Sequence, residues 1–569
     1  MMRGHLPAPL FSAALLFVLA AAPAHAGNFI LSNNDGPGEG FNDPTPVSPV
    51  GGNPGTTLGQ QRQNVFITAG LIWGSILPSH VDIQVDATFD PLTPCDSTSG
   101  VLGSAGATSV LSDFPGALVP NTWYPIALAN KLAGSDQTPG SAHITAQFNS
   151  SVDNSTCLGP TSWYYGYDHN EGTNIDLLAV VLHEMGHGLG FQTFANVSTG
   201  AFLNGRADIF ATDLFDHTAN LRWDQMTNAQ RQASSINTGQ LVWNGPNVLH
   251  AAPQFLGPAT IVRVNSPAGI AGEKAFGTAS FGGAPPDPAL SAQVVLANDG
   301  VGTTSDACEP LVNGAQIAGK IALIDRGTCT FTAKAAAAQA AGAVAVIIGN
   351  NAAGSPPAMG GSDPSITIPV VSITQADATA IKGQLAGGVN VSIGVDHSRL
   401  AGTDLQGRPL MYTPNPLQLG SSVSHWDTSE TPNLLMEPFI NSDLTGVDLT
   451  QYVFADIGWL GTVTAVADGP APVAPARAFS TPNPFSAAAS IRFSLGAPGK
   501  TEVDIYDVRG ALVKRLPSAW RPAGSQSVSW DGTDSHGRPS PTGVYFWRVL
   551  SSGSNAPGEV LSGRMVRVN

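Results

Sequence analysis

The spacing of apolar side chains predicts helices and strands in the N-terminal half of the chain. Residues 60–76 carry apolar side chains at helical spacing, which predicts an amphipathic helix. Residues 81–89 (VDIQVDATF) alternate between apolar and polar, as a half-buried strand does. Residues 142–148 predict another short strand.

The most apolar helical stretch is residues 175–189 (IDLLAVVLHEMGHGL). A helix that is apolar on nearly every face belongs inside a core. Thr173 or Asn174 is expected to cap its N-terminus, because both side chains can accept a hydrogen bond from the first helical turn.

The pattern changes near residue 247. Residues 331–341 (FTAKAAAAQAA) predict a helix among short β-rich runs. Those runs are residues 293–297, 320–325, 343–349 and 368–373. Strand, helix and strand in that order predict a small α/β module. Residues 401 to about 460 show no strong period.

A Pro/Ala-rich stretch, residues 463–478, predicts a linker before the last part of the chain. Strand patterns then return, separated by glycine-containing turns. They begin at Ile491, Thr501, Ser527, Val544 and Met565. This succession of short strands predicts a small β-sandwich.

Composition supports several folded domains and excludes one class of partner. The chain has 569 residues, of which 42% are hydrophobic and only 12% charged, with 64 glycines and 44 prolines. A chain of this length is too long to fold around a single hydrophobic core. The glycine and proline content indicates long ordered loops. The net charge of −16 argues against a nucleic-acid partner, which needs a basic surface.

The first 26 residues resemble a secretory signal peptide. Arg3 supplies the positive charge, Leu10 to Ala22 the apolar stretch, and Ala24-His25-Ala26 a cleavage site. This apolar stretch is too short to span a membrane, and no later segment is long enough. We therefore expect an exported protein, secreted or held at a bacterial cell surface.

Export permits disulfides between the four cysteines. Pairing by neighbourhood would join Cys95 to Cys157 and Cys308 to Cys329, but four cysteines allow three connectivities. The cysteine spacing does not match a zinc finger.

Residues 183–187, His-Glu-Met-Gly-His, provide the strongest chemical signal. Residues i and i+4 lie on one face of a helix, so His183 and His187 can bind one metal ion, typically zinc. Glu184 lies beside them and is predicted to act as general base on a zinc-activated water. Two histidines and a glutamate in an apolar helix would be unfavourable without such a partner.

A third protein ligand is required, and the sequence offers several histidines. Gly190 matches the HExxHxxGxxH pattern, but Thr193 stands where that pattern has its last histidine. The candidates further along are His217, His250, His397 and His425. Asp216 beside His217 favours a solvated or capping role for that histidine.

His425 lies in the segment Gly420-Ser-Ser-Val-Ser-His-Trp426, which is followed by Leu434-Leu-Met-Glu-Pro438 and Asp456-Ile-Gly-Trp459. This succession resembles the leishmanolysin group of metzincin peptidases. The resemblance implies that His183, His187 and His425 bind zinc, that Glu184 is the base, and that Met436 forms a turn beneath the metal. It covers roughly residues 60–246 and 400–460.

Two further resemblances concern the rest of the chain. Ala307–Leu311 and Gly319–Phe331 resemble a protease-associated (PA) domain, in which we expect Asp325 and Arg326 to form a structural turn salt bridge. Pro482–Phe485, Ile505–Gly510 and neighbouring motifs resemble the Ig-like sorting domains of bacterial type IX secretion substrates, related to a flagellar hook-cap fold. That resemblance implies recognition by the secretion machinery.

The sequence therefore predicts an α+β protein with a metzincin-like domain, split by an α/β PA insert and followed by an Ig-like β-sandwich. The expected divisions are 1–26 signal peptide, 27–246 and 401–460 metzincin-like domain, 247–400 PA insert, 461–478 linker and 479–569 Ig-like domain. The predicted function is zinc-dependent endoproteolysis of proteins or peptides. The alternative is a surface adhesion protein that keeps an inactive peptidase scaffold; calcium sites are not predicted.

Overall fold

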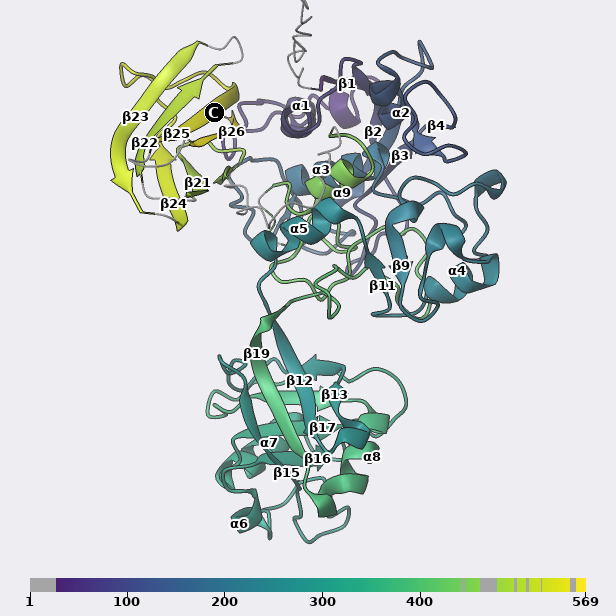
Figure 1. Cartoon of the computed structure of the whole chain (residues 1–569), viewed down its shortest axis with the longest axis vertical. Coiled ribbons are helices and arrows are strands. Elements are labelled where there is room, and N and C mark those ends of the chain that lie inside the picture. Colours follow the sequence, from purple (N-terminus) through teal and green to yellow (C-terminus); the bar gives the residue numbers. More distant parts are fainter. Residues whose placement is uncertain are drawn as a thin grey trace, which may run out of the picture.

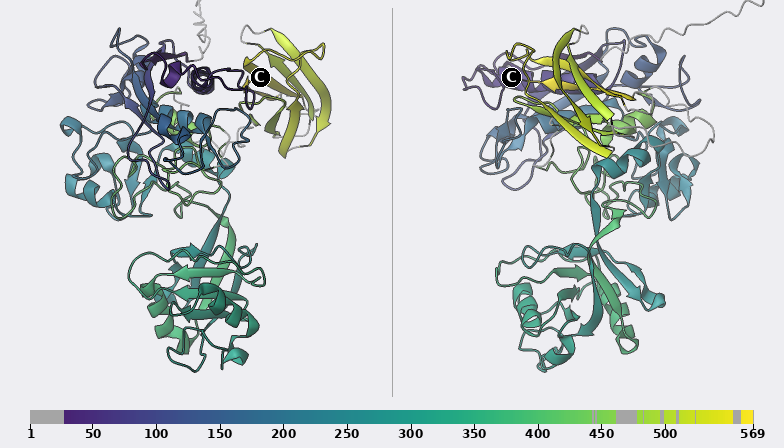
Figure 2. Two further views of the ribbon diagram at one scale, coloured as in Figure 1. Left: turned by 180° about the vertical axis from the view of Figure 1, so that it is seen from behind. Right: turned by 60° about the vertical axis from the view of Figure 1, so that its left-hand side comes forward.

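The computed structural model describes residues 27–441, 444, 446–460, 478–481, 483–495, 499–507, 511–522, 524–552 and 559–568. The predicted signal peptide and nearly all of the predicted linker lie outside these residues. Figure 1 shows an N-terminal body, an insert that extends from it on two strands, and a C-terminal β domain beside α1 (Leu58–Ile76). In both views of Figure 2 the insert and the C-terminal domain lie at different ends of the N-terminal body.

The N-terminal body is built on a four-stranded sheet in the order β1 (Phe29–Asn33), β2 (Ile83–Asp90), β6 (Ile144–Asn149) and β3 (Gly103–Ala107). The first three strands are parallel, whereas β3 runs antiparallel to β6 at the edge. Alternate residues of β2 are buried, which confirms the period-2 pattern. The helices α1 and α3 (Leu177–Leu189) pack against each other and against this sheet.

The remaining elements of this body are short. They are α2 (Ile126–Ala133), α4 (Asn228–Ser234), α5 (Pro246–Phe255), α9 (Thr450–Asp456), the strand pairs β4 (Val110–Leu111) with β5 (Tyr124–Pro125) and β7 (Trp163–Tyr164) with β8 (Ile175–Asp176), and the sheet β10 (Leu221–Arg222), β9 (Leu214–Asp216), β11 (Leu241–Trp243). One hydrophobic core joins segments from both sides of the insert, because Trp73 and Met185 share it with Trp426 and Trp459.

The insert begins later than expected. Residues 247–257 belong to the N-terminal body, since Val248, Ala251 and Ala252 of α5 are buried in its core and α5 packs against α9. The insert therefore runs from β12 (Pro258–Ser266) to β19 (Asn390–Leu400), which pair antiparallel where they leave the body.

The insert is an α/β module, as predicted. Its eight-stranded sheet has the order β13 (Gly272–Glu273), β12, β19, β15 (Leu290–Leu296), β16 (Ile321–Asp325), β17 (Ala345–Gly349), β18 (Val370–Ile373), β14 (Phe276–Thr278), and its helices are α6 (Gly314–Ile317), α7 (Phe331–Ala340) and α8 (Gln375–Gln384). The prediction of a salt bridge between Asp325 and Arg326 is wrong. Asp325 pairs with Lys382, and Arg326 donates to Asn350 Oδ1 at 3.1 Å.

The C-terminal domain is a sandwich of two antiparallel sheets. One has the order β20 (Ala478–Thr481), β21 (Ala489–Leu495), β24 (Gly524–Trp530), and the other β23 (Leu512–Arg521), β22 (Gly499–Tyr506), β25 (Gly543–Ser552), β26 (Glu559–Arg567). The buried rings of Trp530 and Trp547 fill its core. The domain contacts α1, because Arg564 donates to the carbonyl oxygen of Ile76 at 3.0 Å.

Both disulfides expected from neighbourhood are present, Cys95–Cys157 and Cys308–Cys329. Among the described residues, the helices lack the combination of length and apolar character needed to cross a membrane.

Candidate metal centre

Helix α3 presents the His-Glu-Met-Gly-His segment from inside the core. Its N-cap is Asp176 rather than Thr173 or Asn174, and Asp176 Oδ1 accepts the Leu178 N–H at 2.8 Å. The expected caps are displaced because Ile175 and Asp176 first pair with β7, which delays the helix start. The helix ends at Gly190, whose φ of +124° lets the chain turn away and favours glycine.

The structure brings His425 to the two helical histidines. The Nε2 atoms of His183, His187 and His425 form a triangle in which every side is 3.2 Å. The three side chains are buried, and they form one of the groups in the described residues able to hold a metal ion.

Backbone carbonyls determine which nitrogen of each ring carries a proton. The Nδ1 atoms lie 2.7 Å from Leu435 O for His183, 2.9 Å from Phe191 O for His187 and 2.8 Å from Ser421 O for His425. A carbonyl oxygen only accepts, so each Nδ1 must donate its hydrogen. In the neutral rings, all three Nε2 lone pairs therefore face one point.

The triangle has the dimensions that a tetrahedral zinc ion needs. A point about 2.05 Å from each corner, the usual Zn–N distance, lies about 0.9 Å above the plane and subtends N–Zn–N angles of about 103°. Burial also lowers the pKa of His183 to about 4 and of His187 to about 3, and that of His425 well below its usual value. Neutral imidazoles are the form that binds metal.

Glu184 lies between the histidines and the edge strand β3. Its side chain is buried, and burial raises its pKa to about 8, although the Ala105 N–H donates to the carboxylate and opposes the rise. Gly103 on the same strand leaves room for it, since a Cβ there would lie 3.2 Å from Glu184 Cγ. The predicted base is thus adjacent to the three histidines and to the edge strand of the sheet.

Met436 packs against helix α3 at Gly186. Its side chain is fully buried, and its Sδ would be 2.7 Å from a Cβ placed on Gly186. The Trp426 N–H donates to the Met436 carbonyl at 2.9 Å, which fastens this turn to the segment that carries His425.

The other candidate histidines lie elsewhere. His217 Nε2 is 2.9 Å from Asp404 Oδ2 in a half-buried pair, and His397 is exposed beside Asp287. His250 lies on the exposed side of α5. None of these three is part of the His183 cluster.

Two residues of the Asp456-Ile-Gly-Trp459 motif have positions that the sequence did not reveal. The Trp459 indole donates to Leu189 O at 2.9 Å, which satisfies a carbonyl at the end of α3. Asp456 accepts the N–H groups of Asn247 and Val248 at 2.8 and 3.2 Å and so caps α5. The motif was a visible signal, but its partners are about 200 residues or more away in the chain.

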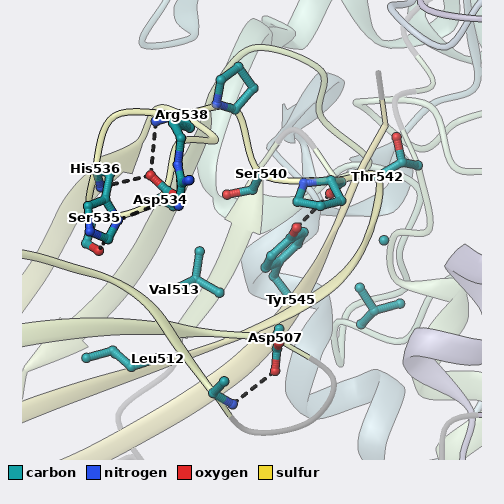
Figure 3. Close-up of a pocket in the computed structure, with 15 residues that line it drawn as sticks. Asp507, Leu512, Val513, Asp534, Ser535, His536, Arg538, Ser540, Thr542 and Tyr545 are labelled. Carbon is teal, nitrogen blue, oxygen red and sulfur yellow. Dashed lines mark hydrogen bonds and ion pairs between the residues drawn. The ribbon is translucent and has the colours of Figure 1, made fainter.

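A pocket elsewhere in the molecule is separate from this centre. It lies in the C-terminal domain among turns between residues 507 and 545 (Figure 3). Its polar groups are largely paired, since Arg538 donates to Asp534 at 3.0 Å and the Tyr545 hydroxyl donates to Pro541 O at 2.6 Å.

Comparison with known families identifies two of the domains. The family model described as "PA domain" matches residues 290–381. The insert is therefore a PA domain. The model described as "FlgD Ig-like domain" matches residues 484–554, which agrees with the β-sandwich at the end of the chain.

Individual relatives match only parts of the chain. A probable lipoprotein aminopeptidase, LpqL, from Mycobacterium tuberculosis is 36% identical over 106 residues, 18% of this chain and 20% of that protein. A zinc aminopeptidase structure from Bacillus subtilis is 30% identical, covers 25% of this chain and 31% of its own, and has a TM-score of 0.19. FlgD from P. aeruginosa is 28% identical over 14% of this chain and 61% of its own, with a TM-score of 0.13.

These matches cover only part of this chain and part of each relative. The chain spans about a fifth of the curated aminopeptidase and about a third of the aminopeptidase structure. The leishmanolysin resemblance and the sorting role of the last domain stay predictions.

Proposed function

We propose that the chain is an exported zinc metalloendopeptidase of the metzincin type. His183, His187 and His425 would bind one zinc ion, Glu184 would be the general base, and Met436 would support the metal from below. The observation that carries this proposal is the equal-sided triangle of Nε2 atoms, each 3.2 Å from the others and each directed by a carbonyl on its Nδ1.

The residues of the centre suit this chemistry. A bound zinc ion would supply Lewis acidity, polarising a scissile carbonyl and lowering the pKa of an attacking water. Glu184 would accept the proton from that water and deliver it to the leaving amine. The single N–H of Ala105 leaves acceptor positions of the carboxylate open, and one of these would take the proton.

The edge strand β3 supports an extended peptide as substrate. It pairs with β6 on one side only and carries the small residues of the sequence GSAGA beside α3. A peptide could add to its free edge as a further strand and pass Glu184 and the histidines. Because this binding mode uses the peptide backbone on both sides of the cleaved bond, it favours endoproteolysis.

Zinc content and hydrolysis of casein test the proposal together. Wild type should hold one zinc ion per chain and cleave casein until a chelator is added. Glu184→Ala should keep the zinc and lose hydrolysis, whereas His425→Ala should lose the zinc. Two exposed residues outside the centre, His397→Ala and Glu39→Ala, serve as matched controls and should behave as wild type.

Two outcomes would contradict the proposal. Full activity in Glu184→Ala would remove this residue from the mechanism. Zinc binding without cleavage of casein or of peptides with blocked N-termini would favour the alternative, a surface binding protein on a peptidase scaffold. Cleavage confined to free N-termini would make the enzyme an aminopeptidase, the activity named for the relatives.

The other parts of the chain fit an exported enzyme. We propose that the C-terminal domain is recognised by a secretion machinery, and that residues 1–26 direct export. The PA domain contributes no residue to the histidine centre, so its proposed role is substrate contact at a distance.

A further inference from the structure

Thr193 connects the helix that carries two histidines to the segment that carries the third. It is the sixth residue after His187, where a contiguous pattern would have its last histidine. Its backbone N–H donates to Ser424 Oγ at 3.2 Å, and Ser424 directly precedes His425. The Thr193 hydroxyl donates to Asp208 Oδ2 at 2.8 Å.

Asp208 is a fixed attachment point for Thr193. Its side chain is buried and also accepts the N–H groups of Phe194 and Ala211, each at 2.8 Å. The backbone at this position is bridged to Trp123, and the Ile209 N–H donates to the Trp123 carbonyl at 2.9 Å. Several hydrogen bonds therefore fix the Asp208 carboxylate. Because the Thr193 hydroxyl donates to this carboxylate, the position of Thr193 is fixed as well.

The His425 segment needs such an attachment. It lies 238 residues from His187 in the chain and is built of loops rather than a helix or strand. Val423 has a φ of +75°, an unfavourable backbone for a β-branched residue, and is fully buried. Strained backbone of this kind persists only when its surroundings hold it.

Two other hydrogen bonds join the segment to Tyr412. The Val423 N–H donates to Tyr412 O at 2.8 Å, and the Tyr412 N–H donates to His425 O at 2.9 Å. The hydrogen bond from Thr193 to Ser424 links this segment to the exit of α3, next to the ring contact between Phe191 and Trp426, whose centroids are 5.1 Å apart. This hydrogen bond lies one residue before His425, so it helps to set the distance between the His425 ring and the His187 ring.

We infer that Thr193 and Ser424 are positioning residues that hold His425 at coordinating distance from the two helical histidines. This inference rests on the proposed zinc site. Neither side chain is placed as a metal ligand, so their effect would be on the geometry and affinity of the site. Replacing supporting residues around a metal site typically weakens metal binding about 10- to 100-fold.

The test measures metal binding rather than activity. Ser424→Ala and Thr193→Val are prepared with two matched controls, Ser429→Ala on the same segment and Thr212→Val on the turn after Asp208. Zinc affinity is measured by competition with a chromophoric chelator, and coordination geometry by the visible spectrum of the Co²⁺-loaded protein.

We expect Ser424→Ala and Thr193→Val each to weaken zinc binding about 10-fold and to change the Co²⁺ spectrum. Both control variants should behave as wild type. Ser424→Thr keeps the hydroxyl and should restore both properties. The double variant should lose less than the product of the single losses, because the two hydrogen bonds that are removed, Asp208 with Thr193 and Thr193 with Ser424, act in series on His425.

Unchanged affinity and an unchanged Co²⁺ spectrum in folded Ser424→Ala would overturn the inference, whatever the activity. If Thr193→Val does not fold, Ser424→Ala decides alone, since it exchanges a half-buried hydroxyl for hydrogen. A wild-type protein that binds neither Zn²⁺ nor Co²⁺ would instead overturn the proposed function, and this inference with it.

Discussion

Gly186 should be intolerant of even one added methyl group, because Met436 lies directly beneath it. A Cβ at this position would lie 2.7 Å from Met436 Sδ and 3.2 Å from its Cε. Contacts below 3 Å require movement, and Met436 is fully buried, so its neighbours limit that movement.

The magnitude follows from two opposing effects. Overpacking of a dense core costs about 1–3 kcal/mol, whereas glycine to alanine within a helix contributes up to about 1 kcal/mol in favour of folding. Gly186→Ala should therefore lower the free energy of unfolding by about 1–2 kcal/mol. Gly383→Ala on α8 is the matched control, since nothing lies within 4 Å of its Cβ position, and it should be neutral or stabilising.

The assay is chemical denaturation of both variants, of Met436→Ala and of the double variant Gly186→Ala/Met436→Ala. Met436→Ala alone should cost about 2–5 kcal/mol through its cavity. In the double variant the added methyl fills part of that cavity, so its loss should be smaller than the sum of the single losses. Additive losses in the free energy of unfolding would refute the packing of Met436 against Gly186. A Gly186→Ala variant that is more stable than wild type would refute it as well.

Three further predictions concern other sites. Trp459→Phe should lower the free energy of unfolding by about 1–3 kcal/mol in denaturant titration, because Leu189 O loses its buried donor; an unchanged value would show that water replaces the indole. Burial and the nearby Asp456 raise the pKa of Asp213 to about 7, so the contribution of Asp213 to stability should fall as pH rises from about 4 to about 7. Asp213→Asn should therefore have a higher melting temperature than wild type at pH 8 but not at pH 4. An equal difference in melting temperature at the two pH values would contradict this reasoning. Removing metal with a chelator should lower the melting temperature of wild type more than that of His425→Ala. Equal shifts in the two proteins would show that His425 does not bind the metal.

Sequence patterns predicted the elements whose burial is regular. The residues of β2 alternate between buried and half-buried, and α3 is buried along its whole length, so their periods were visible. The strand β23 was not predicted, because Leu516 is its one buried residue and most of the others are exposed. The start of the insert was misplaced because α5 looks like any short helix until its packing against α9 is known.

The candidate site divides in the same way. His183, Glu184 and His187 could be found from local spacing, because the helix itself sets their geometry. His425 required a family resemblance, since nothing local relates residues 238 positions apart. The roles of Thr193 and Asp208 were not predicted. The contact of Thr193 with Ser424 forms only when the chain returns from the insert, and the contact of Asp208 with Thr193 joins two loop residues that no periodic pattern relates.

The most direct test of the central claim is anomalous diffraction at the zinc absorption edge from crystals of the matured protein. The account predicts one strong peak about 2.0–2.1 Å from the Nε2 atoms of His183, His187 and His425. A peak coordinated by other residues, or none at these histidines in protein supplied with zinc, would contradict it.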